Sequence, residues 1–194
     1  MAVHSWIAFK EKDADSFEVV HVVGWAARNG GDAIRRSFDI PDRRWYGSTP
    51  VIINDIRGED AEKAIPKIRE AIDSYAYPNF YRMYPGPNSN SFVSHIIRNV
   101  DELKVELPPN AIGKDWIDDG DFFGYSESGS GVQVSVFGLL GLTLGLREGI
   151  EINLLGMTLG IDFLRPALKL PAVGRLGFSD GPVYDPDEDK KSNK

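Results

Sequence analysis

A leucine-rich segment that recurs near the C-terminus most restricts how this chain can fold. Residues 139–146 read LLGLTLGL, and residues 154–161 repeat the pattern as LLGMTLGI, at an offset of 15 residues. Leucine alternates with glycine and threonine, and each glycine weakens a helix by about 1 kcal/mol, so the pattern favours β-strands. With a turn at residues 147–149, it predicts an antiparallel β-hairpin. Its leucine face must be covered, and we favour packing on the main core over contact with lipid.

Composition and charge describe an ordinary globular domain. The 194 residues are 42% hydrophobic and 26% charged, which suffices for one core. The formal net charge of −7 argues against broad binding to nucleic acid or to an anionic membrane. A local basic patch at Arg35, Arg36, Arg43 and Arg44 is interpreted as a solvated loop.

The residue types needed for metal or thiol chemistry are scarce. The chain has no cysteine, which excludes disulfides, thiolate ligands and a cysteine nucleophile. Its three histidines are too few and too scattered to predict a zinc site. The acidic residues 115–121 lack the spacing of a calcium loop and are interpreted as solvated. We therefore expect no metal and no cofactor.

The N-terminus carries no recognisable targeting signal. No stretch reaches the 18 or so apolar residues of a membrane span, and no signal peptide is visible. The first apolar run nevertheless begins almost at Met1. We expect the natural protein to carry a leader before it, such as a membrane anchor or an export signal.

Hydrophobic periodicity gives the remaining elements. The predicted strands are residues 3–9, 17–25, 35–38 and 51–56, and the predicted helices are residues 59–75 and 89–99. Pro66 indicates a late start or a kink in the first helix. Residues 126–131 are predicted to be a flexible glycine-serine linker, and the charged tail 185–194 to be disordered.

The second helix begins at a loop that carries small polar residues. Asn88 or Ser89 can cap its first turn, and apolar residues follow at helical spacing from Phe92. A side chain there faces free backbone N–H groups and the positive end of the helix dipole. Enzymes place nucleophiles in such positions, and ordinary helix caps occupy them too.

A serine nucleophile needs a histidine within hydrogen-bond reach. His95 lies on nearly the opposite face of the same helix as Ser89 and is interpreted as a surface or interface residue. His4 and His21 lie on the first two predicted strands, so a strand beside the helix can present either one to Ser89.

Two short motifs resemble circularly permuted papain-like folds, which include desumoylating-type peptidases and lecithin retinol acyltransferase relatives. Residues 4–7 (HSWI) resemble the histidine strand of these folds, and residues 88–92 (NSNSF) resemble their nucleophile helix, with serine in place of cysteine. Nearly the full length also resembles a bacterial family of uncharacterised proteins, the domain of unknown function 3750. The segments that carry this second resemblance are residues 43–47, 85–90, 111–115 and 137–142.

The papain-like resemblance implies roles for individual residues. Ser89 would be the nucleophile and His4 the base, with Glu18 or His21 as the orienting group. The backbone N–H groups of Ser89 and Asn90 would form an oxyanion site. The candidate substrate-binding residues are Asn88, Asn90, Trp6, Tyr81 and Tyr84, although aromatic residues before Asn88 pack a loop on the core just as readily.

Together these observations predict an α+β, permuted papain-like domain, with a small antiparallel sheet packed on two helices and a C-terminal β-hairpin extension. The expected division is a core at 1–125, a packed extension at 126–184 and the tail. The predicted function is a hydrolase or acyltransferase acting on an amide, ester or thioester. The alternative is a binding or scaffold domain, in the bacterial cytoplasm or associated with the cell envelope. A small-molecule, peptide or acyl substrate is expected and nucleic acid is not; membrane contact is expected only through the hairpin or a leader.

Overall fold

The computed structural model describes residues 3–28, 30–117 and 120–179, which form two antiparallel sheets and three helices. The first sheet has the order β1-β2-β3, from Ile7–Phe9, Phe17–Val22 and Ile34–Asp39. The helices are α1 (Gly24–Ala27), α2 (Glu59–Asp73) and α3 (Ser89–Asn99). The α+β class predicted from the sequence is thus confirmed.

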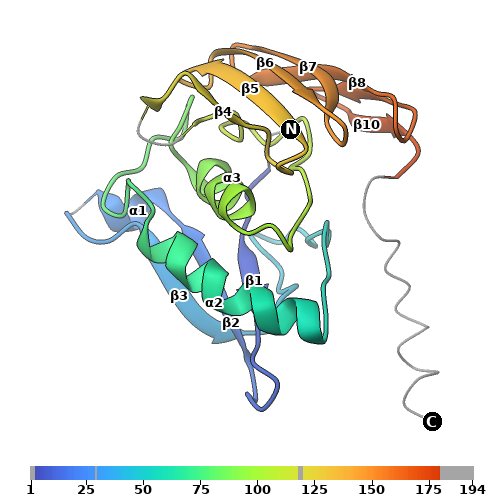
Figure 1. Ribbon diagram of the computed structural model, residues 1–194. Coiled ribbons are helices and arrows are strands. Elements are labelled where there is room, and N and C mark those ends of the chain that lie inside the picture. The colour runs from blue at the N-terminus through green and yellow to red at the C-terminus, as the bar shows by residue number, and fades with distance from the viewer. Residues whose placement is uncertain (1–2, 29, 118–119, 180–194) are drawn as a thin grey trace.

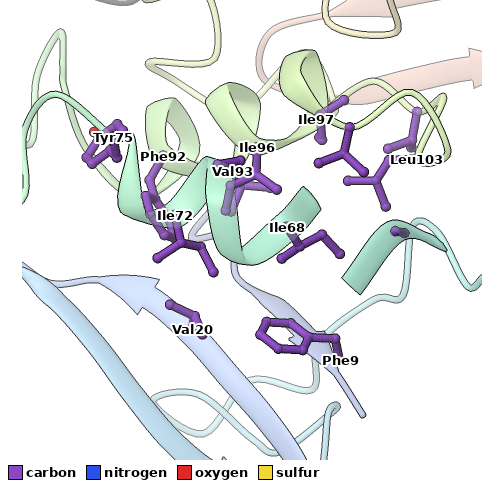
Figure 2. Close-up of a cluster of buried hydrophobic side chains, with 14 of the residues drawn as sticks. Phe9, Val20, Ile68, Ile72, Tyr75, Phe92, Val93, Ile96, Ile97 and Leu103 are labelled. Carbon is purple, nitrogen blue, oxygen red and sulfur yellow. The ribbon is translucent and has the colours of Figure 1, made fainter. Parts of the chain in front are cut away.

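The main core lies between the first sheet and the two longer helices. Phe9 and Val20 come from the sheet, Ile68 and Ile72 from α2, and Phe92 from α3 (Figure 2). Helix α2 buries one stripe of apolar residues at the helical spacing that the sequence predicted, whereas α3 is buried on all sides from Ser89 to Ile97. Figure 1 shows α2 against the small sheet and α3 between α2 and a second, larger sheet.

The second sheet is a seven-stranded meander, in which each strand pairs with the next along the chain. Its strands are β4 (Phe123–Tyr125), β5 (Gly131–Val136), β6 (Leu140–Gly145), β7 (Gly149–Leu154), β8 (Met157–Asp162), β9 (Ala167–Leu170) and β10 (Gly174–Gly177). The predicted boundary at 125/126 falls at the end of β4, whereas the sheet itself begins at Phe123.

Several sequence predictions about this region are wrong. The repeated leucine segments are β6 and β8, which do not pair with each other because β7 lies between them. The predicted turn at residues 147–149 does connect β6 to β7. Residues 126–131 are an ordered turn rather than a linker, since the Ser126 N–H donates to the carbonyl of Gly131 at 3.0 Å and Ser126 is fully buried.

Other differences concern single elements. Residues 51–56 form no strand in the described structure, and α1 was not anticipated. Helix α2 runs continuously through Pro66. Arg35 and Arg36 lie on β3 rather than in a loop, and Arg36 is paired with Glu18 at 3.0 Å. The predicted disordered tail lies outside the described residues.

No helix in the described ranges is both long and apolar enough to cross a membrane.

Candidate functional site: an aromatic cleft beside the start of helix α3

The first turn of α3 is held by Asn88, not by Ser89. Asn88 Oδ1 accepts hydrogen bonds from the N–H groups of Asn90 (2.9 Å) and Ser91 (3.3 Å). Ser91 Oγ accepts in return from the Asn88 N–H at 3.2 Å, which completes a capping box. The Asn90 N–H, predicted to be an oxyanion donor, is therefore already bound inside the protein.

Asn90 connects this turn to the N-terminal segment. Ser5 Oγ donates to Asn90 Oδ1 at 2.9 Å, and Asn90 Nδ2 donates to the carbonyls of Val3 (3.1 Å) and Ile112 (2.8 Å). Val3 and Ser5 flank His4, so the backbone around His4 is held directly against the start of α3. The segments that carry His4 and Ser89 are therefore joined through Asn90, and we call this contact between the N-terminal segment and the start of α3 the seam.

His4 itself is paired with His21 from β2. His4 Nε2 and His21 Nδ1 are 2.9 Å apart, so one ring donates and the other accepts. Burial, and then the neighbouring His21, lower the pKa of His4 from 6.5 to about 4. Burial, and then the positive charge of Arg43, lower the pKa of His21 to about 4 as well. Both rings are consequently neutral near pH 7.

Trp45 encloses this histidine pair. Its ring stacks on His4 with centroids 4.9 Å apart and an interplanar angle of 12°, and it meets His21 edge-on at 4.9 Å. Trp25 stacks on Trp45 in turn, at 6.0 Å and 22°. Arg43 lies over the Trp45 ring, 5.5 Å from its centroid. Imidazole and indole rings from four separate segments thus form one wall.

This wall borders a cleft of about 610 Å³. Asn79, Phe80, Tyr81 and Met83 also line it, and Tyr81 packs so closely on α1 that a Cβ at Gly24 would lie 2.7 Å from its ring. Burial raises the pKa of the Tyr81 hydroxyl. The residues that line the cleft with rings or charge are His4, Trp25, Arg28, Trp45, Tyr46, Phe80 and Tyr81.

Ser89 does not line this cleft. It is the first residue of α3 and is 3% exposed. Among the described residues, its hydroxyl makes no hydrogen bond to His4 or to His21. The structure thus brings the Ser89 and His4 segments together without forming a serine–histidine hydrogen bond.

Three further predicted site residues have partners elsewhere. The Glu18 carboxylate is bound by Arg36 and by Arg69, the latter at 2.7 Å, and so does not orient His4. Trp6 Nε1 donates to the carbonyl of Pro41, and the Tyr84 hydroxyl donates to the carbonyl of Leu155 in the turn between β7 and β8. Neither Trp6 nor Tyr84 lines the cleft.

His95, interpreted from the sequence as a surface or interface residue, is buried between helices α2 and α3. His95 is 5% exposed, and its Nε2 lies 2.8 Å from the carbonyl of Ala71 at the end of α2. It therefore joins α3 to α2. In the described residues, no three potential metal ligands of the histidine, aspartate or glutamate type lie close enough to hold an ion.

Sequence reasoning missed most of the cleft. Trp25, Trp45 and Tyr46 were not predicted as site residues, although Trp45 and Tyr46 fall in the segment 43–47 that carried the family resemblance; Phe80 belongs to the aromatic run before Asn88, for which cleft lining and packing on the core were both open. Trp45 lies in a connection without periodicity, where only the clustering of aromatic and arginine residues hinted at a role.

The fold and the cleft define an α+β domain with an aromatic, histidine-containing pocket. The chain belongs to the family described as "Protein of unknown function (DUF3750)", whose model matches residues 1–116 and so includes every residue of the cleft. Searches of the curated proteins and of the solved structures find no match to it.

Proposed function

We propose that this protein is a binding domain that takes a small molecule or a peptide segment into the aromatic cleft. The observation that carries the proposal is the cleft itself, about 610 Å³ with one wall made from Trp25, Trp45 and His4. Pockets of a few hundred Å³ lined by aromatic rings with a few polar groups are typical of ligand sites. The nucleophile candidate Ser89 lies outside it, so binding without chemistry accounts for the arrangement most directly.

The lining indicates the kind of ligand. Stacked indole rings favour a flat or ring-shaped group, and the neutral His4 ring adds a polar group without charge. Arg28 is an exposed residue of the cleft lining, which contains no carboxylate among the described residues. A planar group that carries a carboxylate or another anion therefore suits the cleft best.

Tryptophan signals in an NMR titration test this proposal. The chain has four tryptophans, so a ¹⁵N-labelled sample gives four indole N–H resonances. N-acetylphenylalanine is expected to shift the Trp25 and Trp45 signals and to leave that of Trp116, which does not line the cleft, unchanged. N-acetylglucosamine is the second probe in the titration, because it is a neutral ring of similar size.

Replacing Trp45 by alanine is expected to abolish the Trp25 shift while the Trp116 signal keeps its position. The proposal fails if neither probe moves Trp25 or Trp45 at millimolar concentration, or if the shifts persist in the Trp45→Ala variant.

A second candidate is a serine hydrolase or acyltransferase on a papain-like fold. The seam at Asn90, which holds the His4 backbone against the first turn of α3, favours it. In such a reaction Ser89 Oγ would attack an acyl carbonyl and pass its proton to His4. The acyl–leaving-group bond would break as His4 protonates the leaving group, and water would then release the acid. His4 would first have to leave His21, and a pKa of about 4 makes it a weak base near pH 7.

Labelling with a fluorophosphonate probe separates the two candidates. Modification that occurs in the native chain and is lost in both Ser89→Ala and His4→Ala supports the enzyme. Absence of Ser89-dependent labelling, together with a positive titration of Trp25 and Trp45, leaves the binding function alone.

A further inference from the structure

The outward face of the second sheet is apolar across all seven strands. In register, one row runs from Tyr125 and Val132 through Leu144, Ile150 and Ile161 to Leu168 and Leu176. A second row comprises Phe123, Val134, Leu142, Ile152 and Leu159, and a third comprises Val136, Leu140, Leu154 and Met157. Each of these side chains is 40 to 73% exposed. We call the three rows the apolar face.

The opposite face of this sheet is polar and buried. Gln133, Thr143, Glu151, Asn153 and Lys169 alternate with the apolar residues and are at most 4% exposed. Lys169 Nζ binds Glu106 at 2.6 Å and Glu151 at 2.8 Å, and Lys114 Nζ binds Glu151 at 2.8 Å. These buried contacts, in which Glu151 carries the negative charge, join the sheet to the segments that follow α3. The sheet therefore cannot turn its apolar face inward, because a one-residue shift would place charged groups in water and break every pair.

The extent of the apolar face fits an interface between subunits. Seven strands about 4.8 Å apart, and up to six residues long, span about 30 by 20 Å. The accessible surface of such a corrugated face exceeds its projected area and approaches the roughly 800 Å² that each partner hides in a standard interface. Monomeric proteins rarely expose an apolar patch of that size.

The residues of the apolar face, and the charge of the chain, indicate which partner covers this face. The outward positions of β5 to β8 carry only Val, Leu, Ile and Met, as in the charge-depleted centre of a homodimer interface. No lysine or arginine lies among them to hold an anionic lipid surface, and the chain carries a net charge of −7. A second identical sheet offers an equally apolar surface, and two sheets pack face to face about 10 Å apart.

We propose that the apolar face binds the same face of a second copy of this chain, which gives a two-fold symmetric dimer with a sheet-on-sheet core. Ile152, in the middle row of the central strand β7, then lies near the two-fold axis.

The test measures the mass of the full chain by sedimentation equilibrium over a range of concentrations. The expected result is a particle of twice the 21.5 kDa chain mass. Ile152→Glu is expected to weaken the dimer at least 100-fold and to retain the native circular dichroism spectrum. Phe38→Glu is the matched control, since Phe38 is 76% exposed on the small sheet and should leave the dimer unchanged.

A cysteine variant keeps the proposal testable if Ile152→Glu does not fold. Because the chain has no cysteine, Ile152→Cys supplies the only thiol, and a bismaleimide reagent that spans the gap between two packed sheets is expected to cross-link it into a covalent dimer, whereas Phe38→Cys is expected not to be cross-linked. A chain that stays monomeric at all concentrations, or a dimer insensitive to Ile152→Glu, overturns the proposal. A monomer that floats with neutral phosphatidylcholine vesicles, and loses this property in Ile152→Glu, overturns it in favour of lipid.

Discussion

His4 and His21 share one hydrogen bond, with 2.9 Å between Nε2 of the first ring and Nδ1 of the second. One of these two nitrogens carries the proton and the other accepts it, so protonation of the accepting nitrogen would force two N–H donors together. Trp45 packs on both rings and limits their movement away from each other. The pair is therefore built to remain neutral, which makes it sensitive to acid.

The stability of the protein should fall as the pH drops from 6.5 to about 4. Both histidines have a pKa of about 4 in the folded chain and 6.5 when unfolded, so the unfolded chain binds more protons in this window. Each pKa unit corresponds to about 1.4 kcal/mol. Because the rings border an open cleft, solvent screening reduces the total, and we expect a loss on the order of 2–4 kcal/mol. Urea unfolding at pH 4.5, 5.5, 6.5 and 7.5 measures it.

Carboxylates also titrate in this range. The contribution of the histidine pair is therefore measured as the difference between the stability loss of the native chain and that of a variant without the pair. The double variant His4→Gln/His21→Gln should lose less stability than the native chain between pH 6.5 and 4.5. If the unfolding free energy changes equally with pH in the two proteins, the histidine pair does not contribute to the acid sensitivity.

Asn90→Ala should weaken the seam between the N-terminal segment and α3. The substitution removes the acceptor of Ser5 Oγ and the donor to the carbonyls of Val3 and Ile112, in a position where Asn90 is 3% exposed. We expect a loss of about 2–3 kcal/mol in unfolding free energy and a displaced Trp45 indole signal.

Asn99→Ala provides the control for this prediction. Asn99 is exposed on the same helix and donates to the carbonyl of His95 at 2.8 Å, so its loss should cost less than about 1 kcal/mol. Equal losses in the two variants would mean that the seam contributes no special stability.

The parts of the site that the sequence predicted correctly are local. The Asn88 cap and the start of α3 follow from residues adjacent in the chain, and the pairing of β1 with β2 brings His4 near His21. Asp115 shows the opposite case, because its position in an acidic loop indicated a solvated residue. It is 2% exposed and binds Gln133, Asn153 and Thr158, which come from β5, β7 and β8. The residues next to Asp115 in the sequence do not predict these partners, which follow it by 18 to 43 positions.

The second sheet illustrates a different limit of prediction from the sequence. Alternation of leucine with small residues predicts strands, but it does not say which face turns inward. The usual assumption that apolar residues lie inside fails here because the alternate positions include Glu151 and Lys169, whose buried charges are paired across segments. A pattern read along one strand contains no information about that pairing.

Gly113→Ala should destabilise the start of α3 through the Asn88 cap. Gly113 has a φ of +98°, and a Cβ there would lie 2.6 Å from Asn88 Nδ2. Gly129 also has a positive φ, +71°, but nothing lies within 4 Å of its Cβ position. Thermal unfolding should show a loss of about 1 kcal/mol for Gly129→Ala, from backbone strain alone, and about 2–4 kcal/mol for Gly113→Ala. Similar losses would contradict the role of the close contact.

Lys169→Met should be the most destabilising single change among these predictions. Lys169 is 1% exposed and donates to Glu106, to Glu151 and to the carbonyl of Glu148. Burial, and then the Glu151 carboxylate, raise the pKa of Glu106 to about 8. Although burial opposes it, Lys114 and Lys169 hold the pKa of Glu151 below its usual value. Glu151 therefore carries the buried negative charge, and removing Lys169 leaves that charge with Lys114 alone.

Because breaking one side of a buried ion pair leaves an uncompensated charge, we expect a loss of about 3–5 kcal/mol, measured by urea unfolding at pH 7. Lys63→Met is the control, since the ion pair of Lys63 within the described residues is an exposed one of 3.8 Å with Glu59, and its loss should leave stability nearly unchanged. Adding Glu151→Gln to Lys169→Met should recover part of the loss, because it removes the stranded carboxylate. A double variant less stable than Lys169→Met would instead assign the effect to packing of the lysine side chain, and would argue that charge pairing does not hold the second sheet to the core.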